Sequence, residues 1–153
     1  MIKKVIGGYI LGLTHNIKSI NKSVIPKEGP VIIYSNHVSK YDHLLIGLFF
    51  KRKLYYVKGI TNESEVLSSL KDGKAVLIFG ALNKNYYSYF STTDISVTSY
   101  PATIIPCAIT GDYKFGKDLT VTFGDKLDLN GMTNSEIKTY LEEKVKELML
   151  GRK

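Results

Sequence analysis

Short apolar runs alternate along this chain with segments in which apolar positions recur every three or four residues. The runs are rich in β-branched residues and are bounded by glycine, proline or charged residues, which is typical of buried strands. Proline cannot donate to a strand ladder, so Pro106 inside one of these runs favours an edge strand or a bulge there. The runs predict strands over residues 31–34, 53–59, 75–79, 102–109 and 119–123.

The segments between and after these runs carry helix signals. Residues 42–50 are mostly apolar and begin with Asp42, a carboxylate that is favoured at a helix N-terminus. Residues 62–70 have the pattern of a short capped helix that ends before Asp72-Gly73. Because strands alternate with helices, the sequence predicts an α/β domain with a largely parallel or mixed sheet.

The last helix has the clearest signals. Residues 133–136, with the sequence Thr-Asn-Ser-Glu, fit a capping box, in which the first and last side chains bond to each other's backbone amides. Gly151 marks the end of this helix. The apolar face predicted between them consists of Ile137, Leu141, Val145 and Leu148.

Residues 1–22 also have helical spacing of apolar positions, with the lysines off the apolar stripe. The pattern predicts an amphipathic helix over 1–22, followed by the α/β domain over 23–153. Two roles stay open for this helix: it lies in a membrane interface, or it packs its stripe on the domain. His15 falls in this segment without an evident partner, and we interpret it as a surface residue.

Composition narrows the class of protein. A chain of 153 residues is one domain that can bury a real core, and it has no apolar run long enough to span a membrane. Its net charge of +7 favours an anionic partner, such as a phospholipid surface, a phosphorylated substrate, CoA or nucleic acid. The eleven tyrosines prompt a nucleic-acid hypothesis, but no RNA-recognition motif, helix-turn-helix or zinc spacing appears, so we expect no nucleic-acid partner.

Candidate chemistry lies at the end of the first predicted strand. That strand runs into Asn36-His37, and Asp42 follows five residues after the histidine. A turn could bring the carboxylate back against the imidazole, fixing its tautomer and making the other ring nitrogen a better proton acceptor. The spacing therefore predicts an oriented general base, although it also fits a strand-end histidine followed by an ordinary helix-capping aspartate.

In the form Asn36-His37-x-Ser39-x-x-Asp42 after a strand, this segment resembles the first motif of the glycerolipid acyltransferases, the 1-acylglycerol-3-phosphate acyltransferase family and its relatives. The resemblance implies a glycerolipid-acyltransferase-like sandwich with a mixed, largely parallel sheet flanked by helices. Three later segments are similar to further family motifs and occur in the same order, at residues 70–79, 105–111 and 121–127.

The resemblance implies acyl transfer from acyl-CoA or acyl carrier protein to the hydroxyl of a lysophospholipid or glycerolipid. His37 would be the general base and Asp42 would orient it, while Asn36 and Ser39 are candidate substrate-binding residues. Strand-end backbone amides or the Ser39 region would stabilise the oxyanion. Cys107, in the middle of a predicted strand, is interpreted as a core residue and a poor nucleophile.

No metal or cofactor is expected beyond the acyl donor as co-substrate. The expected location is cytoplasmic, at the periphery of an anionic membrane surface.

The chain departs from the family where the family has Pro-Glu-Gly-Thr-Arg, a motif assigned to binding the acceptor phosphate. Residues 80–84 read Gly-Ala-Leu-Asn-Lys, so the glutamate falls on Ala81 and the arginine on Lys84. Lys84 and Lys58 would then face the phosphate as point charges, since a lysine cannot make the paired hydrogen bonds of an arginine. A catalytically inactive acyl- or lipid-binding relative of the same fold remains the alternative.

Overall fold

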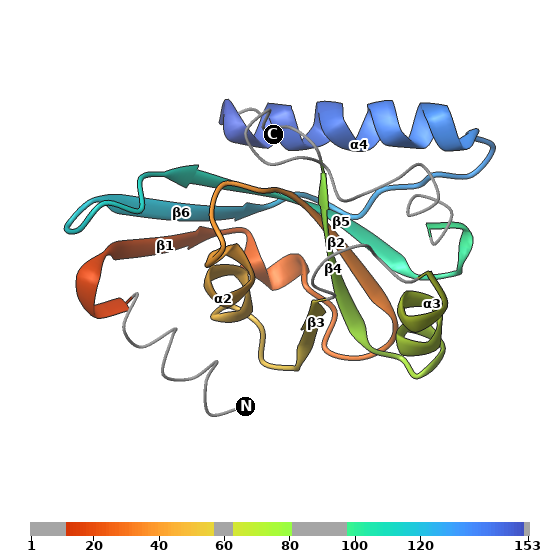
Figure 1. Cartoon of the computed structure of the whole chain (residues 1–153). Helices are drawn as coiled ribbons and strands as arrows, with labels where there is room; N and C mark the ends of the chain where they lie inside the picture. Colours follow the sequence, from red (N-terminus) through yellow and green to blue (C-terminus); the bar gives the residue numbers. More distant parts are fainter. Residues whose placement is uncertain (1–11, 57–62, 81–97, 152–153) are drawn as a thin grey trace.

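The computed structural model describes residues 12–56, 63–80 and 98–151, which form one six-stranded sheet with helices on both faces (Figure 1). The predicted α/β architecture is confirmed. The strands are β1 (Asn16–Ile20), β2 (Val31–Asn36), β3 (Leu54–Tyr56), β4 (Ala75–Gly80), β5 (Thr103–Gly111) and β6 (Asp118–Phe123). The helices are η1 (Lys22–Val24, a 3-10 turn), α2 (Asp42–Gly47), α3 (Glu63–Lys71) and α4 (Asn134–Met149).

The sheet is mostly parallel, as the sequence predicts. Its strand order is β1-β6-β5-β2-β4-β3, and β2 pairs in parallel with both β4 and β5. The β3–β4 and β1–β6 pairs are also parallel, whereas β5 and β6 run antiparallel. All six residues of β2 are buried, because both faces of the strand are covered. A strand of this kind is expected to be apolar at almost every position.

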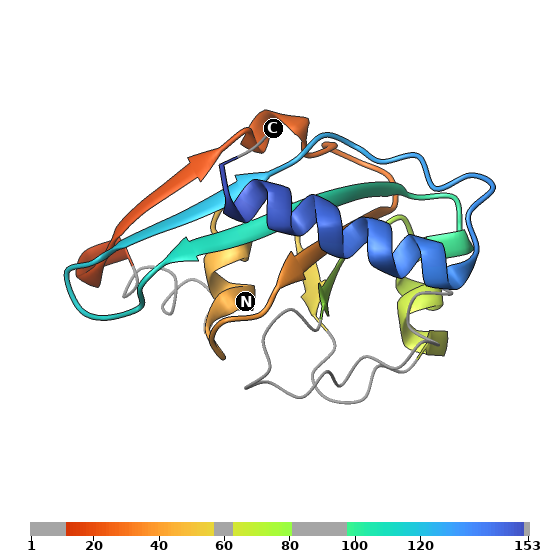
Figure 2. The same cartoon turned by 90° about the horizontal axis from the view of Figure 1, so that it is seen from above.

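Successive residues of β2 point into two separate layers of the core. Val31 and Ile33 pack in the cluster that contains the apolar side chains of α2. Ile32 and Tyr34 pack on the opposite face, in the cluster that contains α3 and α4. Figure 1 shows α4 on one side of the sheet and α2 on the other, and Figure 2 shows α4 lying across the strands.

Pro106 lies in an internal strand, so the expectation of an edge strand is wrong; the pairing beside it is irregular, with the extra residue in the segment opposite Pro106. Cys107 pairs with Phe123, but Ile104 pairs with Leu127, so residues 124–126 on one side face residues 105–106 on the other. The carbonyl of Pro106 accepts a hydrogen bond from the amide of Gly124 at 2.8 Å. In a strand, the N–H and C=O of one residue point to the same side, so a donor at Pro106 would point toward residues 124–126. Because β6 ends at Phe123, no strand residue on that side needs this donor.

The helix predicted over residues 1–22 is wrong for Asn16–Ile20, which form β1; residues 1–11 lie outside the described residues, and residues 12–14 are helical. β1 pairs with the open edge of β6, which satisfies the backbone groups on that side of β1, and Ile17 packs against the α2 side of the core. The sheet therefore begins before the expected boundary at residue 23. A membrane-interface role for the preceding segment stays a prediction.

The C-terminal helix begins and ends as predicted. The side chain of Thr133 accepts from the amide of Glu136 at 3.2 Å, and the carboxylate of Glu136 accepts from the amide of Thr133 at 3.3 Å. Gly151 follows the helix with a φ of 72°, a left-handed conformation that favours glycine. The buried residues of α4 are Ile137, Leu141 and Val145.

Replacing Thr133 by alanine removes the acceptor of this capping box. We expect Thr133→Ala to lower the free energy of unfolding by about 1 kcal/mol, the usual contribution of a helix cap. Thr133→Ser keeps the hydroxyl and should unfold close to the wild-type protein. Urea denaturation of the three proteins measures the difference, and equal midpoints for the alanine and serine variants would contradict the prediction.

Candidate functional site

His37 is the first residue after β2, at the sheet edge where β2 and β4 end side by side and β5 continues beyond them to Gly111. Because β2 lies between β4 and β5, this edge is a topological switch point, where open α/β sheets bind their ligands. The imidazole stacks on Phe79 of β4, with ring centroids 4.4 Å apart, and its side chain is 22% exposed. The histidine is thus held by the sheet while remaining open to solvent on one side.

Asp42 is the first residue of α2 and is completely buried. Its Oδ2 lies 2.8 Å from Nδ1 of His37 and accepts from the backbone amides of Val38 at 2.6 Å and Ser39 at 2.9 Å. An ionised carboxylate has no hydrogen to donate and can only accept. In the hydrogen bond with Asp42, the hydrogen is therefore on Nδ1 of His37. The predicted pairing of histidine and aspartate is present, and the turn between them holds the carboxylate.

Tyr113 completes the surroundings of the carboxylate. Its hydroxyl donates to Oδ1 of Asp42 at 2.6 Å. Burial, followed by the charge of Asp42 and this hydrogen bond, raises the pKa of Tyr113 well above the ordinary tyrosine value, so the hydroxyl stays a donor. Sequence reasoning missed Tyr113; the available signal was its place just after Gly111, the end of a strand that shares the edge of β2.

The amides of Val38 and Ser39 do not suit the oxyanion role expected for this turn. Both donate to Asp42, so an oxyanion would need other donors. The side-chain oxygen of Ser39 accepts from the amide of Tyr41 at 3.2 Å, which closes the turn into α2. Ser39 therefore shapes the turn, and its contact with substrate stays a prediction.

Asn36 joins two strands. It is 2% exposed; its Nδ2 donates to the carbonyl of Ile109 at 3.0 Å, and its Oδ1 accepts from the amide of Ile109 at 2.7 Å. The register of β2 with β5 extends to Ser35 and Cys107, so the amide side chain continues the ladder beyond it. The structure gives Asn36 a role in closing the sheet beneath His37, and its binding of substrate stays a prediction.

His15 is not the unpartnered surface residue that the sequence suggested. Its Nε2 lies 2.6 Å from the carbonyl oxygen of Tyr113, and its Nδ1 lies 2.7 Å from the hydroxyl of Thr14. A carbonyl only accepts, so Nε2 donates to Tyr113 and Nδ1 accepts from Thr14. The turn before β1 is thereby tied to the residue that holds Asp42.

The remaining candidate residues divide into two groups. Lys58 and Lys84 lie outside the described residues. Cys107 is fully buried in β5, and burial raises the pKa of its thiol to about 12, opposed by a hydrogen bond from Ser35 and assisted by the charge of Asp42. The thiol is therefore protonated near neutral pH, which agrees with its interpretation as an inert core residue.

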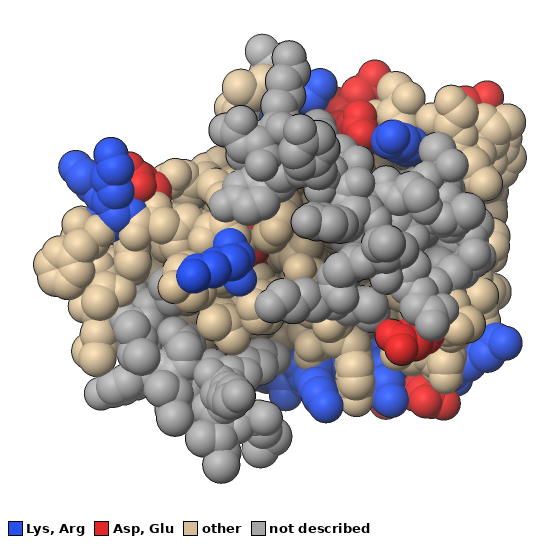
Figure 3. Space-filling view, in the orientation of Figure 1, with Lys and Arg blue, Asp and Glu red and all other residues tan. Residues whose placement is uncertain are grey.

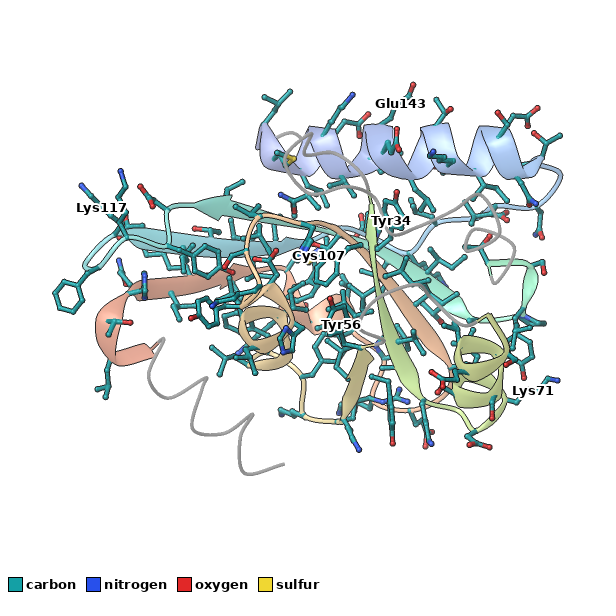
Figure 4. The ribbon with its side chains drawn as sticks, viewed as in Figure 1. Tyr34, Tyr56, Lys71, Cys107, Lys117 and Glu143 are labelled. Atoms are coloured by element: carbon teal, nitrogen blue, oxygen red, sulfur yellow. The ribbon has the colours of Figure 1, made fainter. Side chains whose placement is uncertain are left out.

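Aromatic rings flank the pair on the side of β3. Tyr56 meets the edge of Phe79 with centroids 5.3 Å apart, and His43 of α2 stacks on Tyr56 at 4.9 Å. Burial, and then the charge of Asp42, raises the pKa of Tyr56. Figure 4 shows Tyr56 and Cys107 in the region between the sheet and α2. The imidazole thus stacks on a ring that belongs to a cluster of aromatic side chains.

Charged side chains of both signs lie on the face of the molecule seen in Figure 3. The basic and acidic side chains are interspersed over the coloured part of that face.

Within residues 12–56, 63–80 and 98–151, no group of three or more histidine, cysteine or acidic side chains could hold a metal ion. In the same ranges no helix has the length and apolar character needed to cross a bilayer.

Comparisons with known proteins address the fold. No protein-family model and no curated protein sequence matches the chain. Among solved structures, it is similar to the crystal structure of the 1-acyl-sn-glycerophosphate (LPA) acyltransferase PlsC from Thermotoga maritima, with a TM-score of 0.76. The match covers 97% of this chain and 77% of that one, at 17% sequence identity. The two proteins share a fold.

The role of Asn36 leads to a stability prediction. Asn36→Ala leaves the buried N–H and C=O of Ile109 without their partner, and we expect a loss of about 1–3 kcal/mol for each group left unpaired. Asn130→Ala is the matched control, because Asn130 is exposed and its backbone amide, which the substitution keeps, donates to Asp128. Urea denaturation measures both variants. A stable Asn36→Ala protein with a raised KM would instead identify a substrate contact.

Proposed function

We propose that this protein is an O-acyltransferase that moves an acyl chain from acyl-CoA or acyl carrier protein to the hydroxyl of a lysophospholipid or related glycerolipid. The observation that carries the proposal is the 2.8 Å bond between His37 and a completely buried Asp42 at the carboxyl edge of the parallel strands. Support comes from the sequence motif around the pair and from the fold shared with a protein named as an acyltransferase.

The histidine supplies what the reaction lacks. An alcohol is a poor nucleophile at neutral pH, so a base must take its proton as the oxygen attacks the thioester carbonyl. Since Nδ1 of His37 is held by Asp42, Nε2 would receive this proton. The C–S bond then breaks, the acyl group stays on the acceptor oxygen, and the proton passes from Nε2 to the leaving sulfur.

Asp42 serves this step electrostatically. When His37 holds the proton it is an imidazolium, and the buried carboxylate beside Nδ1 stabilises that charge. The apolar rings of Phe79 and Tyr56 strengthen this interaction, because charges interact more strongly where water is excluded.

The acceptor phosphate would be bound by lysines. Lys58 follows β3 and Lys84 follows β4, two strands that run parallel to β2 and so end at the edge that carries His37. Each lysine would act as a point charge. The proposed location is cytoplasmic, with the protein associated peripherally with an anionic membrane surface, for which the net charge of +7 is the support.

A second candidate function is binding without catalysis. It is favoured by Ala81, which stands where the resembling family has a glutamate. A protein of this kind would hold an acyl chain or a lysolipid at the same edge of the sheet and would not turn over.

The proposal is tested by following thiol release from acyl-CoA with and without a lysophospholipid acceptor, with acyl carrier protein as the second donor. We expect release that depends on the acceptor. We expect His37→Ala to lower it by roughly 10²–10⁴-fold, the usual contribution of a general base, with the circular dichroism spectrum unchanged. Undiminished transfer by His37→Ala would reject the enzyme. Absent transfer by the wild-type protein, together with measurable acyl-CoA or lysolipid binding, would establish the binding function.

A further inference from the structure

One oxygen of the Asp42 carboxylate is held from outside its own turn. The partners of Oδ2 are His37, Val38 and Ser39, which all precede the aspartate by a few residues. Oδ1 accepts from Tyr113, which is 71 positions away in the chain. Rotation of the carboxylate about its Cβ–Cγ bond moves both oxygens together, so a donor on Oδ1 opposes any rotation that would displace Oδ2. Tyr113 is therefore in a position to set the direction in which Oδ2 meets the imidazole.

Tyr113 is itself held by a closed hairpin. It lies between β5 and β6, where the amide of Asp112 donates to the carbonyl of Asp118 at 3.0 Å. Gly111 has a φ of 108°, and a side chain there would collide with the backbone of Asp118. The hairpin thus closes tightly at the point where Tyr113 leaves the strand. Figure 4 shows Lys117 in this hairpin at the far end of the β5–β6 pair.

His15 anchors the hairpin from the other side. Its Nε2 donates to the carbonyl of Tyr113 at 2.6 Å, and Thr14 holds the second ring nitrogen at 2.7 Å. The rings of His15 and Tyr113 also meet edge to face, with their centroids 6.2 Å apart. The amide of Gly116 donates to the carbonyl of Thr14 at 2.8 Å, so two bonds tie the hairpin to the segment before β1.

We propose that Tyr113, anchored by His15, is a positioning residue that fixes the Asp42 carboxylate and through it the His37 ring. His15 donates to the backbone carbonyl of Tyr113, the Tyr113 hydroxyl donates to Asp42, and Asp42 accepts from His37, so these contacts join three separate parts of the chain. Proton transfer depends steeply on such placement, since a displacement of about 1 Å can cost roughly 10²-fold in rate. The kinetic consequence rests on the proposed function, whereas the effect on the His37 ring does not.

The direct readout is the tautomer of His37, measured by nuclear magnetic resonance on protein labelled with ¹⁵N in its three histidines. In the wild-type protein we expect the hydrogen on Nδ1, facing Asp42, with the signals assigned by their loss in His37→Ala. Tyr113→Phe removes one hydroxyl and should give a mixture of tautomers. Tyr140→Phe, which removes the same atom from α4, is the matched control and should leave the His37 signals unchanged.

Variants of His15 separate positioning from simple stabilisation. His15→Ala should change the His37 signals in the same direction as Tyr113→Phe. His15→Gln keeps a side-chain donor for the Tyr113 carbonyl and should restore them. If His15 acts through the Tyr113 hydroxyl, the double variant should match Tyr113→Phe alone. These variants also keep the proposal testable if Tyr113→Phe fails to fold.

Kinetics provides the second readout. We expect Tyr113→Phe to lower kcat by about tenfold while KM stays within about twofold, because the substrate contacts are intact and the base is misplaced. Unchanged His37 signals and unchanged kcat in both Tyr113→Phe and His15→Ala would overturn the proposal. If the variants alter the His37 signals but the wild-type protein shows no acyl transfer, the positioning role is upheld and the acyltransferase function is rejected.

Discussion

The buried carboxylate of Asp42 is the group on which the site depends. An ionised side chain with no exposed surface is costly unless it is paired, by several kcal/mol in real proteins. Here it faces a ring nitrogen, two backbone amides and a tyrosine hydroxyl, all within 2.6–2.9 Å. These partners come from the end of β2, from the turn into α2 and from the β5–β6 hairpin. The carboxylate therefore requires that the sheet, the helix and the hairpin be assembled together.

The sheet delivers these partners to one place. β2 lies between β4 and β5, and its parallel pairing with both brings the end of β2 beside Phe79 and Ile109. Asn36 replaces the last rung of the ladder with its side-chain amide, so β2 and β5 stay joined up to the residue before His37. The imidazole of His37 therefore stacks on Phe79 of β4, while the residue before it, Asn36, is bonded to β5.

The sequence predicted those parts of the structure whose signals are local. The runs over β2, β4 and β5 are apolar at nearly every position because both faces are covered, and the capping box of α4 lies within four consecutive residues. The pairing of His37 with Asp42 could be anticipated because a turn of only four residues separates them. In β1, the helical spacing was overridden by the open edge of β6.

The parts that sequence reasoning missed depend on distant contacts. The bonds from Asn36 to Ile109, from Tyr113 to Asp42 and from His15 to Tyr113 join residues 73, 71 and 98 positions apart. The periodicity or motif of a single segment cannot reveal a contact with a residue so far away in the chain. The shared edge of parallel strands was the only available guide, and it could place Tyr113 near His37 without revealing its bond to Asp42.

The most direct measurement is the rate of acyl transfer by Asp42→Asn. The amide keeps the size of the carboxylate and can still accept from the two backbone amides, but it carries no charge to stabilise the imidazolium of His37. We expect transfer to fall by about 10²-fold or more, as when the aspartate of a catalytic triad is neutralised, with an unchanged circular dichroism spectrum. A folded Asp42→Asn protein that transfers acyl chains at the wild-type rate would contradict a catalytic role for the pair.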